Sequence, residues 1–284
     1  MLKTNLSVVI AGHVCIDHNR SEHATYTNWG SASLYMAQVF ARLYEADVRV
    51  LTSYGPDLLP YLPAVQLIPE EPSQTRTMKY TNITNSQDGI RVQYCFNTRM
   101  AKPTALTAES RLLLSAADIV AVAVLLPNYS VEYVQQLLAP TAPSALKVLC
   151  PQGYFRRIGE HGLVQPRQFI EAESIIKLFD LVVYSEEDYP QAFLSAHNWK
   201  RHSPDTHLVI TQGGQGASIV KTAGVNHVPT KPIAPANILD SVGCGDTFAA
   251  ALAANYYASK DIVGAIKKAH RVAAHKLMAA GDIF

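Results

Sequence analysis

The sequence predicts an α/β fold, in which the strands of a mainly parallel sheet alternate with helices, together with a small separate β-sheet. Short apolar runs typical of buried strands alternate with segments of helical periodicity along most of the 284 residues. Two strand-like segments around Asp88-Gly89 interrupt this alternation and predict an antiparallel hairpin. A hydrophobic content of 48% suits the core of one large domain, so we expect residues 1–284 to form a single unit.

The chain opens with the pattern of a strand–helix–strand unit. Residues 6–11 form a compact apolar run that ends at Gly12, as expected for a buried first strand. A polar stretch rich in His, Asn, Ser and Thr follows over residues 17–28. Apolar side chains recur at helical spacing over residues 30–44, and residues 48–52 are typical of the next strand.

The hairpin signal comes next, in residues 75–81 and 90–96 on either side of Asp88-Gly89. Antiparallel strands inside an α/β chain indicate a small sheet separate from the main one. We interpret this small sheet as a lid.

The alternation of strands and helices resumes after this hairpin and continues to the C-terminus. Strands are expected at residues 119–125, 146–150, 181–184, 207–211, 217–221 and 225–229. Helices are expected at residues 131–138, 168–179, 186–194, 245–258 and 261–279. Alanine-rich faces on the last two helices predict that they pack closely.

Composition excludes several classes of function. Lys and Arg together number 24 and Asp and Glu 23, whereas a nucleic acid or an anionic membrane as partner would favour a basic excess. The apolar runs are too short to span a bilayer, and residues 1–20 lack a secretory signal, so we expect a cytoplasmic protein. The four cysteines are widely spaced and contain no C-x-x-C pair, which predicts neither a zinc site nor a disulfide framework.

Residues 243–248 (GCGDTF) carry the strongest indication of chemistry. They follow an extended, proline-containing segment and open a strongly helical one. Glycines let the backbone turn sharply at a helix start, so the free N–H groups of Gly243, Cys244 and Gly245 form, with the helix dipole, a site for an anion. Beside such a site, Asp246 suits a base that takes the proton from a hydroxyl attacking phosphorus.

A plain helix start explains the same residues when they are taken alone. Aspartate is favourable in a first helical turn because it caps the helix and complements its dipole, without any catalytic role. Cys244 is better interpreted as a small uncharged filler than as a nucleophile, since no histidine is near it in sequence.

Residues 240–246 (DSVGCGD) resemble the second signature of the ribokinase-like (PfkB) family of carbohydrate and nucleoside kinases, usually written D-T-x-G-A-G-D. Its place near the C-terminus, ahead of an alanine-rich helix, is also similar to that family. The resemblance implies a three-layer α/β/α sandwich with a small β-sheet lid, whose segments would lie near residues 13–29 and 73–98. It also implies that Asp246 is the catalytic base and that residues 243–245 form an anion hole.

Weaker similarities to this family extend over most of the chain. Residues 9–17 resemble its opening strand, which implies that Asp17 binds substrate hydroxyls, although a turn or cap residue is an equal alternative. Residues 30–37 (GSASLYMA) lie where the first signature, G-G-x-x-x-N-x-A, is expected, which implies that Gly30 is at the substrate. Two positions depart from that signature, Ser31 and Tyr35. These departures weaken any expectation of ribose or fructose as the substrate.

Two further segments resemble parts of the family that handle substrate, phosphate and metal. Residues 152–156 (QGYFR) imply that Arg156 reaches the substrate or a phosphate, the alternative being a solvated loop arginine. Residues 185–188 (SEED) resemble the N-x-x-E element, which implies that Asp188 helps to hold Mg²⁺ through water. A capped helix start explains the second segment equally well.

Residues 211–216 (TQGGQG) resemble the nucleotide loop T-x-G-x-x-G of the family. The resemblance implies that Thr211, Gly213 and Gly216 bind ATP, although a hairpin turn between two strands also fits these residues. The sequence contains neither a Walker A loop nor the dinucleotide motif G-x-G-x-x-G, which argues against a Rossmann dehydrogenase.

Taken together, the resemblance implies a kinase that uses ATP and Mg²⁺ to phosphorylate a hydroxyl of a sugar, sugar acid or related polyol. An inositol or nucleoside kinase of the same family, or a non-catalytic member that binds a sugar, is the alternative. The predicted hairpin argues against a vitamin kinase of the phosphomethylpyrimidine type. We expect the protein to be a monomer or a homodimer formed through the lid.

Overall fold

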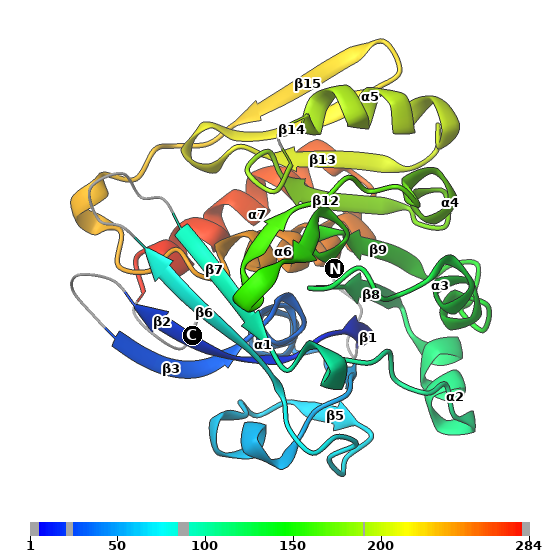
Figure 1. Cartoon of the computed structure of the whole chain (residues 1–284). Coiled ribbons are helices and arrows are strands. Elements are labelled where there is room, and N and C mark those ends of the chain that lie inside the picture. The colour runs from blue at the N-terminus through cyan, green and yellow to red at the C-terminus, as the bar shows by residue number, and fades with distance from the viewer. Residues whose placement is uncertain (1–5, 21–24, 85–90, 190, 280–284) are drawn as a thin grey trace.

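A computed structural model of the chain describes residues 6–20, 25–84, 91–189 and 191–279, and its centre is a nine-stranded sheet (Figure 1). The strands lie in the order β15-β14-β13-β12-β9-β8-β1-β4-β5. Their bounds are β1 (Ser7–Gly12), β4 (Asp47–Leu51), β5 (Gln66–Ile68), β8 (Ile119–Ala123), β9 (Leu146–Cys150), β12 (Leu181–Ser185), β13 (His207–Thr211), β14 (Gly216–Lys221) and β15 (Gly224–Pro229). All pairings are parallel from β5 to β13, and only β14 and β15 are antiparallel to their neighbours. The predicted α/β class is confirmed.

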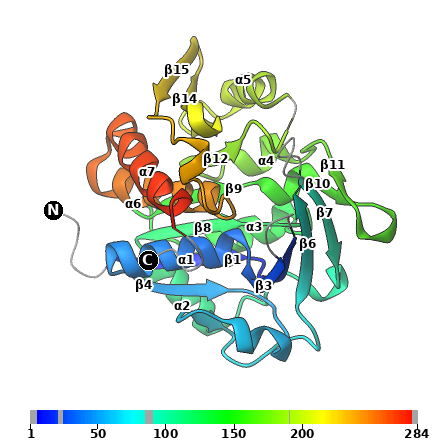
Figure 2. The same cartoon turned by 90° about the vertical axis from the view of Figure 1, so that its left-hand side faces the viewer.

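Helices cover both faces of this sheet, which gives three layers. One face is covered by α1 (Ala32–Tyr44), α6 (Cys244–Ser259) and α7 (Ile262–Leu277), and Figure 2 shows α6 and α7 packed together. The other face is covered by α2 (Ala108–Ala116), α3 (Val131–Leu138), α4 (Ala172–Ile176) and α5 (Ala192–His202). Along β1, Val8 and Ile10 point to the first core and Val9 and Ala11 to the second. Both faces of a parallel strand are thus buried, and this explains its continuous apolar sequence.

A second sheet of four strands stands at one end of the central sheet (Figure 2). It contains β2 (Cys15–Arg20), β3 (Thr25–Gly30), β6 (Met78–Thr84) and β7 (Arg91–Phe96), in the order β3-β2-β6-β7. Two of these strands, β2 and β3, lie in a stretch whose own pattern predicted only a polar segment, although the family resemblance implied a lid segment near residues 13–29. The expected turn Asp88-Gly89 lies outside the described residues. A short hairpin of β10 (Arg156–Ile158) and β11 (Val164–Pro166) adjoins β7 through a bridge from Tyr94 to Leu163.

The helix predicted at residues 186–194 is wrong in its position. Strand β12 ends at Ser185, a turn follows, and α5 begins only at Ala192. In this turn the Ser185 backbone N–H donates to Asp188 Oδ2 at 3.1 Å, and the Glu187 N–H donates to Ser185 Oγ at 3.2 Å. Such local side-chain bonds compete with helical ones, so the acidic residues form a turn instead of a first helical turn.

Helix α6 is buried on all sides over residues 247–255, because it lies between the central sheet and α7. Six alanines among its residues give it a narrow outline that allows this close packing. A helix held on every side fixes the direction of its first turn, where the predicted anion site lies. None of the helices in the described ranges is long and apolar enough to cross a membrane.

Candidate functional site

A pocket of about 1050 Å³ lies among the ends of the central strands, the second sheet and the start of α6. The last residues of β9, β12 and β13, which are Cys150, Ser185 and Thr211, form part of its wall. These are carboxyl ends of parallel strands, where open α/β sheets bind their ligands. The pocket brings together every residue predicted for the site except Gly30.

The loop before α6 requires glycine at its tightest point. Gly243 is the N-cap residue of α6 and has a φ of 76°, a left-handed conformation that side chains disfavour. A Cβ atom there would lie 2.4 Å from the ring of Tyr35. The Cys244 amide donates to the Ser241 carbonyl at 3.3 Å, so an anion at this helix start would share that donor. The loop therefore places its backbone against Tyr35 with no room for a side chain.

Asp246 lies in the first turn of α6 and faces the pocket. Burial raises the pKa of the Tyr35 hydroxyl well above its ordinary value, and the carboxylates of Asp17, Asp240 and Asp246 raise it further. Tyr35 consequently stays neutral and lies within electrostatic reach of Asp17, Asp240 and Asp246.

Asp17 is on β2 and its side chain is buried. The thiol of Cys15 donates to Asp17 Oδ1 at 3.1 Å, and burial together with this carboxylate raises the pKa of Cys15, so the thiol keeps its proton. Gly30 pairs with Cys15 on the neighbouring strand, and a Cβ atom at Gly30 would lie 2.2 Å from the carboxyl carbon of Asp17. Gly30 was predicted to lie at the substrate. It does not line the pocket, because the Asp17 side chain lies over it.

A chain of polar side chains crosses the second sheet and ends at Arg156. Arg156 donates to Gln93 Oε1 at 3.3 Å, Gln93 donates to Asn82 Oδ1 at 2.7 Å, and Asn82 donates to Asn19 Oδ1 at 2.9 Å. Arg156 also lies over the ring of Tyr80, 5.7 Å from its centre. Tyr80, Asn82 and Gln93 were not predicted from the sequence. Residues 80 and 82 are two positions apart on β6, so their side chains lie on the same face of the sheet. This spacing in the sequence could have identified Tyr80 and Asn82.

Arg156 is partly buried and lines the pocket, so the alternative of a solvated loop residue is wrong. Burial opposes its charge, but the Tyr80 hydroxyl and the carboxylates of Asp188 and Asp246 raise the pKa of Arg156 above its ordinary value. The guanidinium is therefore a fixed positive charge within electrostatic reach of two acidic residues of the pocket.

Asp188 is held in the turn after β12. It accepts hydrogen bonds from Gln152 Nε2 at 2.9 Å and from the Ser185 backbone N–H at 3.1 Å. The described part of the chain contains no group of three or more His, Cys, Asp or Glu side chains placed to hold a metal. A Mg²⁺ ion here would take most of its ligands from water and phosphate oxygens, which is its usual preference.

The glycine-containing loop of residues 211–216 is both a turn and a wall of the pocket. It connects β13 to the antiparallel β14, as the hairpin alternative predicts, and Thr211, Gly213 and Gly216 all line the pocket. A Cβ atom on Gly213 would meet nothing within 4 Å, so the backbone here is open to a ligand.

Apolar side chains also line the pocket, and we call the part that they line the apolar chamber. They are Ile233, Ile238, Phe248, Ala273, Ala274 and Leu277. His270 of α7 lies beside Phe248, with ring centres 5.3 Å apart, and its buried Nε2 has no hydrogen-bond partner among the described residues. His270 therefore belongs to the wall of this part of the pocket.

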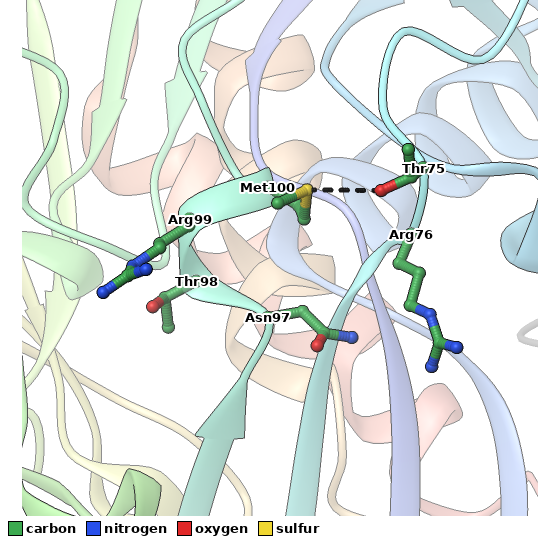
Figure 3. A pocket seen from close by; sticks show the side chains of 6 residues that line it. All are labelled: Thr75, Arg76, Asn97, Thr98, Arg99 and Met100. Carbon is green, nitrogen blue, oxygen red and sulfur yellow. Dashed lines mark hydrogen bonds between the residues drawn. The ribbon is translucent and has the colours of Figure 1, made fainter.

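A second hollow, lined by residues 75–76 and 97–100, lies at the base of β6 and β7 (Figure 3). Its volume is about 330 Å³, and the side chains of Arg76 and Arg99 are exposed and point away from each other. Because these charges do not converge on one point, the hollow forms no defined anion site.

Solved structures identify the fold. Ribokinase from Arabidopsis thaliana, in complex with ribose and ATP, matches 99% of this chain and 95% of its own with a TM-score of 0.70 at 14% identity. A pyrophosphate-dependent kinase of the ribokinase family, in complex with a pyrophosphate analogue and myo-inositol, matches 98% and 97% with a TM-score of 0.75 at 16% identity. A nucleoside kinase from Burkholderia thailandensis, in complex with inosine, matches 98% and 93% with a TM-score of 0.69 at 17% identity. The fold is therefore ribokinase-like, as the sequence predicted.

Sequence comparison identifies the family. Residues 69–284 match the family model of the pfkB family carbohydrate kinases, whereas no curated protein sequence matches the chain significantly. The chain belongs to the pfkB family of carbohydrate kinases, and it is a phosphotransferase with an alcohol group as acceptor.

Proposed function

We propose that the protein transfers the γ-phosphoryl group of ATP to a hydroxyl of a sugar, sugar acid or related polyol. The observation that carries this proposal is the composition of one pocket. It holds Asp246 at the N-terminus of α6, polar groups of the second sheet on one side and a glycine loop with an apolar chamber on the other. An alcohol acceptor and a nucleotide donor would meet at Asp246 in such a pocket.

Asp246 acts as the base in this proposal. It takes the proton of the acceptor hydroxyl while the hydroxyl oxygen forms a bond to the γ-phosphorus, and the bond from that phosphorus to the ADP oxygen breaks. The backbone amides of Gly243, Cys244 and Gly245 and the dipole of α6 stabilise the negative charge on the transferring group. The closed packing of α6 supports this role, because preorganised donors need no rearrangement during the reaction.

The acceptor lies against the second sheet. The Asp17 carboxylate accepts hydrogen bonds from hydroxyl groups, and Asn82 and Gln93 offer both donors and acceptors. Tyr35 forms an uncharged aromatic wall between Asp17 and the anion loop. Arg156 suits the carboxylate of a sugar acid or the transferring phosphoryl group, since its planar guanidinium binds either in a bidentate manner.

The donor lies against the loop of residues 211–216. Thr211, Gly213 and Gly216 contact the phosphates and ribose of ATP, and the apolar chamber holds the adenine. A pyrophosphate donor would leave this chamber without a role, so the chamber favours a nucleotide. Mg²⁺ supplies positive charge to the phosphates when bound, and Asp188 would hold it through water.

The second sheet serves as a lid of a single kinase domain that spans residues 1–284. Its strands β2, β6 and β7 carry acceptor groups, so closure of this sheet would position the acceptor and exclude water, the competing acceptor.

The function is tested by ATP turnover with a panel of sugars, sugar acids, myo-inositol and nucleosides, and with pyrophosphate in place of ATP. We expect phosphorylation of at least one polyol with ATP. Asp246→Asn should lower kcat roughly 10²–10⁴-fold, the usual contribution of a general base, with an unchanged circular dichroism spectrum. Retained turnover in this variant would contradict the base assignment. Binding of a sugar without any phosphorylation would favour the non-catalytic alternative.

A further inference from the structure

One lysine of the last helix is entirely buried. Lys276, in the final turn of α7, has an exposed fraction of 0%. Its Nζ lies 2.9 Å from Oδ2 of Asp240, whose side chain is 19% exposed. A lysine loses its hydration when it is buried, so it is rarely found inside a protein without a charged partner. Asp240 is that partner, and it is the first residue of the loop that leads into α6.

Asp240 connects this buried charge to the loop before α6. Its second carboxylate oxygen, Oδ1, accepts a hydrogen bond from the Val242 backbone N–H at 2.9 Å. The backbone N–H of Leu239 donates to the carbonyl of Leu277 at 2.8 Å, next to Lys276 in α7. The loop is therefore attached to the end of α7 by an ion pair and by a backbone hydrogen bond, immediately before Gly243.

The ion pair also changes the electrostatics of the loop. An unpaired carboxylate at Asp240, three residues before Gly243, would repel any anion bound by the amides at the start of α6. The Lys276 ammonium offsets this charge from inside the protein, where water screens charges weakly.

We propose that Lys276 is a positioning residue of the phosphoryl-transfer site. It neutralises Asp240 and fixes residues 240–243, so that the backbone amides at the start of α6 can hold the transferring group. This inference rests on the proposed function and adds a residue that does not line the pocket.

Charge-matched variants test the proposal. Lys276→Met removes the charge and keeps an unbranched side chain that is one atom shorter. Asp240→Asn removes the opposite charge but retains an oxygen for the Val242 N–H. With the acceptor identified in the panel, we expect each single variant to lower kcat at least 10-fold and to change the KM for the acceptor less than threefold. The double variant should recover at least fivefold in kcat over Lys276→Met, because it leaves no unpaired charge. A kcat within twofold of wild type in Lys276→Met, or no recovery in the double variant, would overturn the proposal.

Lys200 offers a matched control, because it is another buried lysine. It lies on α5, outside the pocket, and its Nζ donates to the carbonyls of Pro204 and Thr206, both at 2.7 Å. Lys200→Met should lower the melting temperature and leave kcat unchanged at temperatures where the protein is folded. If both lysine variants lose kcat in proportion to their loss of stability, Lys276 is only a structural residue and the proposal is wrong.

A measurement without turnover separates this proposal from the proposed function. We expect amide hydrogen exchange of the peptide that contains Val242 and Gly243 to be at least 10-fold faster in Lys276→Met than in wild type, and binding of inorganic pyrophosphate to be weaker. These results would support the positioning role even if no acceptor were phosphorylated. Unchanged exchange would overturn it even in an active kinase. Should Lys276→Met fail to fold, the same exchange measurement on Asp240→Asn decides the question.

Discussion

At the scale of single residues, the site depends on contacts that leave no room for change. Asp17 lies against Gly30 and the Tyr35 ring lies against Gly243, so neither position has room for a side chain. Each glycine thus supports a neighbour that faces the pocket. Both glycines were identified from family signatures, but Gly30 was assigned to the substrate, because the pairing of β2 with β3, which places Asp17 against Gly30, was not predicted.

Gly243→Ala should be strongly destabilising. The new methyl group would meet the Tyr35 ring and the backbone would keep a φ of 76°, a combination that costs roughly 1–3 kcal/mol. Urea unfolding followed by circular dichroism measures this loss. Gly245→Ala is the matched control for stability, since a Cβ atom there meets nothing within 4 Å and its φ is not positive. Equal stability of the two variants would contradict the proposed steric conflict.

At the scale of elements, the sequence predicted strands better than the segments between them. The parallel strands β8, β9, β12 and β13 lie within a few residues of their predicted positions, because buried parallel strands are continuous apolar runs. The antiparallel strands β14 and β15 also lie within a few residues of theirs. The sequence missed α2, whose mean hydropathy is low, and placed the helix after β12 too early, because local bonds of Ser185 and Asp188 stabilise a turn. The pocket wall formed by α7 was also missed, since small residues such as Ala273 carry no chemical signal.

The inner face of α7 should decide donor affinity. Ala274 lines the apolar chamber, so Ala274→Phe would fill space that the proposed adenine needs. We expect the KM for ATP to rise at least 10-fold, with little change in the KM for the acceptor, which we propose to bind against the second sheet. Initial-rate kinetics with each substrate varied in turn measure both constants. An unchanged KM for ATP would place the adenine elsewhere, and Lys267→Ala, on the exposed side of α7, provides the control.

At the scale of the whole molecule, the central sheet and the second sheet meet at a buried histidine. His13 lies between β1 and β2, its Nδ1 accepts the Leu125 backbone N–H at 3.0 Å, and its Nε2 donates to Asn128 Oδ1 at 2.9 Å. Asn128 in turn donates to the Ala101 carbonyl at 2.6 Å, near the end of β7. This network uses both ring nitrogens of a neutral imidazole and connects segments of both sheets, so protonation of His13 would disturb the junction.

The fold should therefore lose stability in mild acid. Burial lowers the pKa of His13 from 6.5 to about 4, so between these values the unfolded chain binds a proton that the folded chain does not. The free energy of unfolding then falls as the pH drops through this window, by about 2 kcal/mol between pH 7 and pH 5 from His13 alone. Urea unfolding of wild type and His13→Gln at both pH values isolates the contribution of His13 to this loss of stability, because glutamine can hydrogen-bond but does not titrate. The variant should be less stable than wild type at pH 7. This gap, the difference in the free energy of unfolding between the two proteins, should be smaller by about 2 kcal/mol at pH 5. A gap that stays constant would show that His13 is not the group whose protonation destabilises the junction.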